Sequence, residues 1–246
     1  SRGLGDVYKR QILTFEDLWP EQGDYDMNDV MIRYTSKVYK SILTNRIYKV
    51  VDEFTPLHRG GYLVNGFGYQ LHNITNSDIS KVTIESPSYA PKSQYMPGET
   101  EAGQSHPTIL LFDNMAIFDN KEEEARKYTV TIQVNDVTSK SILPPYNPFI
   151  FVGSGQARGR EVHLVKYPPT DKADLSLLGT GKDVSRPEED LYYVSIDLMP
   201  FALNMPVSEF PIPEEGIRID ESYPKFATWV KSNGAQAKDW YKYPKK

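Results

Sequence analysis

Residues 127–136 read KYTVTIQVND, and this stretch decides the fold class. β-Branched and aromatic side chains alternate with polar ones, which is the pattern of a strand that buries one face in a core. Asn135 and Asp136 end the stretch with a turn signal. The segment therefore predicts a strand in a sheet that is covered on one side.

Similar signals on both sides of this stretch predict a protein with many strands. Residues 30–39 alternate so that Val30, Ile32 and Tyr34 share one face. Residues 88–108 are rich in Pro, Ser, Gly and Glu and predict a long surface loop. The fold class that follows is mainly β, an antiparallel β-sandwich. Its further strands are expected at residues 45–54, 66–74, 80–87, 108–114 and 149–152.

The C-terminal part of the chain loses this periodicity near residues 143–147. One short helix is expected in ESYPKFATWVKSNG (221–234), with Ser222 as its N-cap and Gly234 as its C-terminal stop. We therefore expect residues 12–145 to form the sandwich with an acidic loop. Residues 146–246 are expected to form an irregular β/α part, either separate or docked on the first as one domain.

The first eleven residues, SRGLGDVYKRQ, resemble one reading frame of a transposon-end adapter used in DNA sequencing. Residues 1–11 are therefore interpreted as an artefact and excluded from the fold prediction, as expression tags are. If so, the natural N-terminus lies outside this sequence. The presence or absence of a signal peptide or lipid anchor then stays open.

Composition narrows the class of protein. The chain has 246 residues, a formal net charge of −5 and no cysteine. The acidic balance argues against nucleic acid as a partner, and no apolar run reaches the roughly 20 residues of a membrane span. The absence of cysteine excludes disulfides, thiolate nucleophiles and cysteine-based zinc sites.

Residues 15–30, FEDLWPEQGDYDMNDV, carry a dense group of carboxylates with no Lys or Arg among them. Asp24, Asp26 and Asn28 follow the spacing D-x-D-x-N, in which a tight loop turns alternate oxygen atoms towards one cation. Ca²⁺ prefers such oxygen ligands, and its charge would offset the repulsion between the carboxylates. The predicted ligands of the cation are Asp24, Asp26, Asn28, Asp29, Glu16 and Asp17.

This loop differs from an EF-hand, which needs Gly where the chain has Asp29 and Glu where it has Thr35. The residues that follow it predict a strand rather than a helix. Zinc is disfavoured because the segment has no His or Cys. The alternative is a solvated turn, since Asp and Asn also favour turns through local hydrogen bonds.

A second group of polar residues lies near RGREVHL (158–164). Arg160, Glu161, His163 and Asp171 could together bind a polar ligand; the alternative is a strand with a structural salt bridge. Glycoside hydrolysis needs two carboxylates across a cleft, and the sequence of an acidic protein neither supports nor rejects it. No catalytic residue is therefore predicted.

The acidic stretch resembles the signature FEDLWP-x-x-GDYD-[FM]-ND of the LruC-domain family, a domain of unknown function from surface proteins of Bacteroidota and some spirochaetes. The resemblance continues after residue 30. It includes NGFGYQLHN (65–73), NPFIFV (147–152), RGREVHL (158–164), LMPFALNMP (198–206) and SYPKFATWVKSNG (222–234).

The resemblance implies a secreted or lipid-anchored β-rich protein at the cell surface or outer membrane, without a known activity. It also favours calcium at Asp24, Asp26, Asn28 and Asp29, because similar patterns occur in extracytoplasmic β-domains thought to bind calcium. Met27 stands where family members usually have Phe, and the swap conserves apolar volume if this side chain packs inward.

The predicted function is a non-enzymatic, extracytoplasmic module with a calcium-binding loop, active in surface binding or adhesion to a glycan or a surface protein. Two alternatives stay open. The first is a carbohydrate-active hydrolase that uses carboxylates of the acidic loop or the region of His163. The second is an envelope structural protein without a small ligand. The oligomeric state is not predicted.

Overall fold

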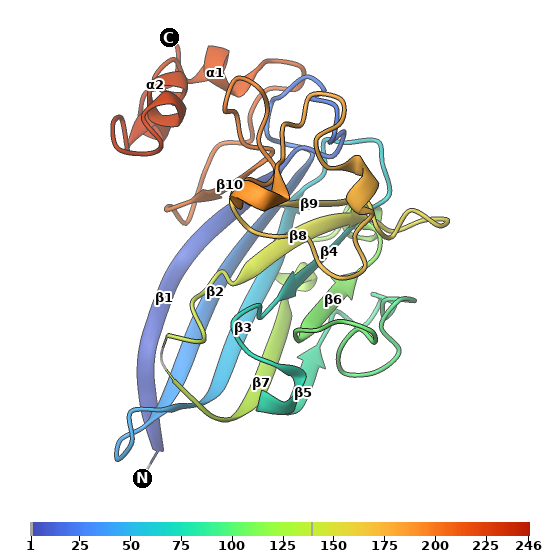
Figure 1. Cartoon of the computed structure of the whole chain (residues 1–246), viewed down its shortest axis with the longest axis vertical. Coiled ribbons are helices and arrows are strands. Elements are labelled where there is room, and N and C mark those ends of the chain that lie inside the picture. The colour runs from blue at the N-terminus through green and yellow to red at the C-terminus, as the bar shows by residue number, and fades with distance from the viewer. Residues whose placement is uncertain (1, 139) are drawn as a thin grey trace.

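The computed structural model describes residues 2–138 and 140–246, and these residues form two antiparallel sheets (Figure 1). The first sheet has the strand order β10–β1–β2–β3–β7–β5, and the second has the order β6–β4–β8–β9. The expected mainly β sandwich is confirmed. The strands are β1 (Arg2–Phe15), β2 (Val30–Ser41), β3 (Ile47–His58), β4 (Asn65–Gln70), β5 (Ile79–Glu85), β6 (Thr108–Phe112), β7 (Tyr128–Val137), β8 (Asn147–Val152), β9 (Glu161–His163) and β10 (Ala202–Met205).

Strand β7 shows why the alternating stretch at 127–136 forms a sheet. Tyr128, Val130 and Ile132 are buried, whereas the threonines and Gln133 between them are half-buried or exposed. Ile132 lies opposite Val50 of β3 on one side and opposite Val82 of β5 on the other. The predicted alternation is confirmed, and it places β7 between two neighbours inside the first sheet.

Aromatic side chains fill the space between the two sheets. The ring of Phe54 from the first sheet lies 5.4 Å from that of Phe67 and 4.9 Å from that of Tyr69, both in the second sheet. Phe67 in turn stacks on Phe112, with ring centroids 6.1 Å apart. These contacts bury large apolar areas, which supply most of the free energy that holds sheets together.

A second apolar cluster covers the outer face of the first sheet near one end. In β2, Val30 and Ile32 face the core between the sheets, whereas Met31 points to the opposite side. There it packs with residues of the C-terminal part, among them Phe226 and Trp240. Figure 1 shows both helices at the end of the molecule that also holds the connection from β1 to β2.

The predicted helix at 221–234 is divided into α1 (Ile219–Ser222) and α2 (Phe226–Lys231). The prediction of Ser222 as an N-cap is therefore wrong, because Ser222 is the last residue of α1. Pro224 disfavours a helical conformation at the residue before it, and Tyr223 accordingly has φ −130° and ψ 85°. The C-terminal stop is confirmed: Gly234 has φ +79° and its N–H donates to the carbonyl of Trp229 at 2.9 Å.

Other short elements complete the chain. Residues 88–107 contain no helix or strand, as the loop prediction required. Strand β9 lies within residues 158–164, where a strand with a structural salt bridge was the alternative to a ligand site, whereas β10 was not predicted from the sequence. Single 3₁₀ turns lie at Asn76–Asp78, Met115–Phe118, Glu123–Arg126, Leu175–Leu177, Pro187–Glu189 and Trp240–Lys242.

Residues 2–11, excluded from the fold prediction, pair with β2 as the first part of β1. Two register shifts interrupt this pairing, between Leu4 and Asp6 and between Tyr8 and Gln11. The side chains of residues 3–11 are exposed or half-buried, whereas Ile12 and Leu13 are fully buried. The artefact interpretation of these residues stays a prediction, because backbone pairing does not depend on their origin.

Both sheets draw strands from both sides of residue 145. Strand β8 pairs with β4 in the second sheet, and β10 pairs with residues 12–15 of β1 in the first.

No helix in the described part of the chain is long and apolar enough to cross a membrane.

Candidate functional site

The acidic loop is the connection between β1 and β2, and most of its polar side chains are buried. Glu16 and Asp26 are 0 % exposed, Asn28 is 1 % exposed, Asp17 is 4 % exposed and Asp29 is 7 % exposed. Asp24, in contrast, is exposed. A solvated turn would leave these groups in water, whereas buried carboxylates need a compensating charge or hydrogen bonds.

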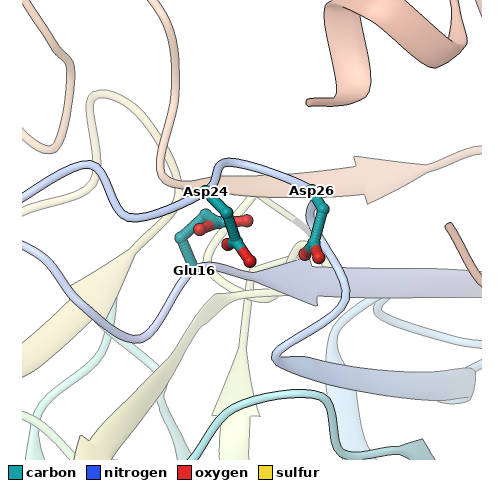
Figure 2. A group of neighbouring side chains, drawn as sticks. All are labelled: Glu16, Asp24 and Asp26. Carbon is teal, nitrogen blue, oxygen red and sulfur yellow. The ribbon is translucent and has the colours of Figure 1, made fainter. Parts of the chain in front are cut away.

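Glu16, Asp24 and Asp26 form a compact group of carboxylates (Figure 2). One oxygen atom from each lies within 4.8 Å of the others. Asp26 accepts hydrogen bonds from the backbone N–H of Asn28 at 3.1 Å and of Gly216 at 2.9 Å. Asp26 is thus held by its own loop, through Asn28, and by the C-terminal part of the chain, through Gly216.

Two buried oxygen atoms in this loop have no hydrogen-bond partner among the described residues. They are Oε2 of Glu16 and Oδ1 of Asn28. The other carboxylate oxygen of Glu16 accepts from the backbone N–H of Met27, and the amide nitrogen of Asn28 donates to the carbonyl of Pro213 at 3.1 Å. Each side chain is therefore fixed by one end and presents a free oxygen at the other.

Acidic and apolar residues alternate along the loop, and this alternation explains the direction of the carboxylates. Tyr25 and Met27 adopt φ of +58° and +62° and place their side chains, fully buried, in the second apolar cluster. The Tyr25 hydroxyl donates to the carbonyl of Pro200 at 2.5 Å. Met27 packs inward, which is the condition under which its exchange for Phe conserves apolar volume. Asp24 and Asp26, which alternate with these two residues, bring their carboxylates to Glu16.

Asp17 and Asp29 form a separate pair beside this group. The N–H of Asp17 donates to Oδ2 of Asp29 at 2.8 Å, and the amide of Asn65 donates to Oδ2 of Asp17 at 2.7 Å. A Cβ atom on Gly61 would lie 2.1 Å from Oδ2 of Asp17, so only glycine fits there. No local sequence pattern reveals this close approach of Gly61 to Asp17.

The pKa values of the loop carboxylates are raised. Burial raises the pKa of Glu16 well above its usual range, and the charges of Asp29 and Asp26 add to the effect. Burial, followed by the charge of Asp17, raises the pKa of Asp29 to about 8. Burial also raises the pKa of Asp26. A bound cation would reverse these shifts, because it stabilises the ionised carboxylates.

The donor set fits a hard cation. It consists of oxygen atoms only, including a buried carboxylate oxygen without a partner, and Ca²⁺ takes such ligands in flexible geometries. Of the six predicted ligands, the structure brings Glu16, Asp24 and Asp26 together. Asp17 and Asp29 pair with each other instead, and Asn28 contacts Asp26 through its backbone N–H.

Glu161 and His163, in contrast, belong to a closed network inside the sandwich. Both are 0 % exposed, and Nε2 of His163 lies 2.8 Å from Oε2 of Glu161. Arg158 binds Glu161 at 2.6 Å and Glu101 at 2.7 Å. Burial alone would raise the pKa of Glu161, but His163 and Arg158 lower it to about 2. Burial lowers the pKa of His163.

The four residues of the predicted polar-ligand site do not converge. Arg160 donates instead to the carbonyls of Trp19 at 2.8 Å and Leu18 at 3.0 Å. Asp171 accepts from the backbone N–H of Ser105. Arg160 thereby links β9 to the acidic loop, a contact that the sequence does not reveal.

Comparison with known proteins defines first the fold and then the family. The crystal structure of a putative lipoprotein from Bacteroides ovatus superposes with a TM-score of 0.71 and 17 % sequence identity, over 97 % of this chain and 74 % of that chain. At this identity the likeness shows the fold alone. Residues 45–241 match the model of the family described as Domain of unknown function (DUF4842), and the chain belongs to this family.

Neither comparison indicates a catalytic family. No curated protein matches the chain. The family match begins after the acidic loop, so the resemblance of residues 15–30 to the LruC signature stays a prediction.

Proposed function

We propose that this chain is a non-enzymatic, extracytoplasmic β-rich module whose β1–β2 connection binds one Ca²⁺ ion. The observation that carries the proposal is the group of Glu16, Asp24 and Asp26, whose oxygen atoms lie within 4.8 Å of one another. The partnerless, buried Oε2 of Glu16 supports a cation there, since a buried carboxylate oxygen is costly without a partner.

The ion would stabilise the fold at the end of the molecule that holds the β1–β2 connection. The loop joins the first two strands of the larger sheet, and its residues Tyr25 and Met27 pack in the cluster with Phe226. Binding of Ca²⁺ would therefore fix the end of the molecule where the C-terminal part covers the sheet. We propose that this end presents a surface for a glycan or a surface protein, with a role in adhesion.

The extracytoplasmic location is supported by the structural neighbour, which is described as a putative lipoprotein. Millimolar Ca²⁺ is common outside the cytoplasm, and extracellular modules bind it with dissociation constants of roughly 10⁻⁴–10⁻³ M. A site with few protein ligands, one of which is the exposed Asp24, suits such an affinity.

The test is thermal unfolding of the full chain in EGTA, in Mg²⁺ and in Ca²⁺. An ion at a hundredfold excess over its dissociation constant stabilises the folded state by about 2.7 kcal/mol. For a chain of this size we expect the melting temperature to rise by about 5–10 °C in Ca²⁺. Calorimetric titration should give one ion per chain.

Two matched variants sharpen the test. Glu16→Gln keeps the shape of the side chain but removes its charge, so it should abolish the Ca²⁺ response without lowering the melting temperature in EGTA. Glu21→Gln removes an exposed charge from the same loop and should respond like the wild type. A wild type that ignores Ca²⁺, or a Glu16→Gln variant that still responds, contradicts the proposal.

A further inference from the structure

A cavity of about 390 Å³ lies at the end of β3. Its lining comes from residues 57–59, from the segment that follows β6 and from Arg126, and it is mainly polar. Met115 and Phe118 form a buried part of the wall, whereas Asn120 is exposed and its side-chain amide has no hydrogen-bond partner among the described residues. The volume falls in the range of roughly 300–1,000 Å³ that sites for small molecules have.

Arg126 brings a positive charge to this cavity that no carboxylate neutralises. Its guanidinium group donates to the backbone carbonyls of Lys121 at 2.8 Å and Leu57 at 2.9 Å. These neutral acceptors fix the side chain, which is half-buried, but they leave its charge in place. Within the described part of the chain, Arg126 forms no ion pair with an acidic side chain. A half-buried cation without a counter-ion favours an anionic ligand.

Arg59 is the second guanidinium group at the cavity, and it is reachable from solvent. It donates to the carboxylate of Asp119 at 2.6 Å and 3.5 Å and to the carbonyl of Gly61 at 3.3 Å. These bonds occupy three of the five N–H groups of the guanidinium, so two remain for a ligand. The side chains of Arg59 and Asp119 are 31 % and 45 % exposed, and ion pairs of this exposure contribute little to stability.

His58 places an imidazole near both guanidinium groups. Burial lowers the pKa of His58; the charges of Arg59 and Arg126 increase this effect, and those of Glu215 and Asp119 reduce it. The imidazole is half-buried, and it has no hydrogen-bond or ion-pair partner in the residues that the structure describes. A neutral imidazole offers one donor and one acceptor, which suits a hydroxyl group of a ligand.

We propose that this cavity binds the carboxylate of a small organic acid that also carries hydroxyl groups, which is the chemistry of a uronic acid residue in a glycan. The carboxylate would accept hydrogen bonds from Arg59 in the field of Arg126. The hydroxyl groups would bind His58 and Asn120.

The charge of the lining selects this ligand over a phosphate group. Two guanidinium groups and the carboxylate of Asp119 give a net charge of +1 with His58 neutral. One carboxylate matches this charge, whereas a phosphate dianion exceeds it and is repelled more strongly by Asp119. The proposal names the glycan for the adhesion role proposed above and in that respect rests on it, but the cavity shares no residue with the calcium site.

The test compares uronic acids with their neutral parent sugars, which lack the carboxylate. The full chain is titrated in EGTA with D-glucuronate, D-galacturonate and D-mannuronate, and with glucose, galactose and mannose. We expect at least one uronate to bind about tenfold more tightly than its parent sugar, because hydrogen bonds to a charged group are the stronger ones. Inorganic phosphate should bind more weakly than that uronate. EGTA removes Ca²⁺, so a failure of this test leaves the calcium proposal standing, and the reverse also holds.

The two members of one ion pair should act in opposite directions. Arg59→Gln removes the donors to the ligand and should weaken binding of the uronate roughly tenfold. Asp119→Asn removes a repelling charge and releases Arg59, and it should strengthen binding up to about fivefold. Arg186→Gln is the matched control, because it deletes an exposed arginine that is also paired with a carboxylate but does not line the cavity. It should bind like the wild type.

Three outcomes overturn the proposal. The first is a wild type that prefers no uronate over its parent sugar. The second is phosphate binding as tight as that of the uronate, which would define a site for any small anion. The third is an Asp119→Asn variant that weakens binding as Arg59→Gln does, since a purely structural ion pair would respond in the same way to the loss of either partner.

Discussion

At the scale of single residues, two buried carboxylates of this sandwich have opposite properties. Glu161 is paired with Arg158 and His163, and its pKa falls to about 2. Asp52 accepts hydrogen bonds from neutral hydroxyls, among them Tyr146 at 2.7 Å and Tyr69 at 3.2 Å. Its burial raises the pKa to about 6. Equal burial thus has opposite outcomes, because only one of the two has cationic neighbours.

This difference predicts how stability depends on pH. The pKa of Asp52 rises from 3.8 to about 6 on folding, so the folded state holds its proton more firmly. The stabilisation is complete below pH 4 and is lost as the pH rises through 6. Asp52→Asn cannot lose a proton. Its free energy of unfolding, relative to the wild type, should therefore increase by roughly 2.4 kcal/mol between pH 4 and pH 7.

Urea unfolding of both proteins across this pH range measures the difference. Comparison at each pH cancels the titration of all other groups, which the two proteins share. A difference that stays constant between pH 4 and pH 7 would show that Asp52 titrates normally in the folded state.

The sequence could predict part of the candidate site at this scale. The spacing of Asp24 and Asp26 follows from a local turn, and the structure brings their oxygen atoms together. The contribution of Gly216, whose N–H binds Asp26, depends on the path of the C-terminal part. No local pattern encodes such a contact, and the same holds for Gly61 beside Asp17.

At the scale of elements, periodicity predicts long strands and misses short ones. Strand β7 has 10 residues, enough for alternation to be recognised. Strand β10 has 4 residues, too few for a period of two to stand out, and β9, with 3 residues, was indicated only as the alternative to a ligand site. Each is a strand because a longer neighbour, β8 or β1, offers it hydrogen-bonding groups.

Strand β1 has two parts, residues 2–11 and the buried residues 12–15, and the difference between them predicts the effect of a truncation. Residues 2–11 contribute backbone pairing with β2, but the side chains of residues 3–11 are exposed or half-buried. Removal of residues 1–11 should lower the melting temperature by only a few degrees, about 2–4 °C for each kcal/mol lost. Leu13→Ala, in the buried part of β1, should cost about 2–5 kcal/mol.

Differential scanning calorimetry of the truncated chain and of Leu13→Ala compares the two parts of β1 directly. If the truncation costs as much as Leu13→Ala or more, residues 2–11 are an integral part of the fold. The interpretation of these residues as an artefact would then be in doubt.

At the scale of the whole molecule, the connection between distant segments decides the architecture. Strand β4 lies between β6 and β8, and β8 comes from the other side of residue 145. Local periodicity identifies β4 and β8 as strands but does not say that they pair. The sequence could therefore predict the sandwich as a class, while its domain organisation depended on pairings far apart in the chain.

We propose on this basis that the chain unfolds as one unit. A fragment of residues 1–145 lacks β8, β9 and β10, and with them Phe149 and Phe151 of the core between the sheets. It also leaves Met31 uncovered on the outer face. We expect this fragment to show no cooperative thermal transition and no near-ultraviolet circular dichroism from packed aromatic rings, whereas the full chain melts in one step. A fragment that melts cooperatively near the temperature of the full chain would instead support two domains, with a boundary close to residue 145, because a domain carries its own core and folds alone.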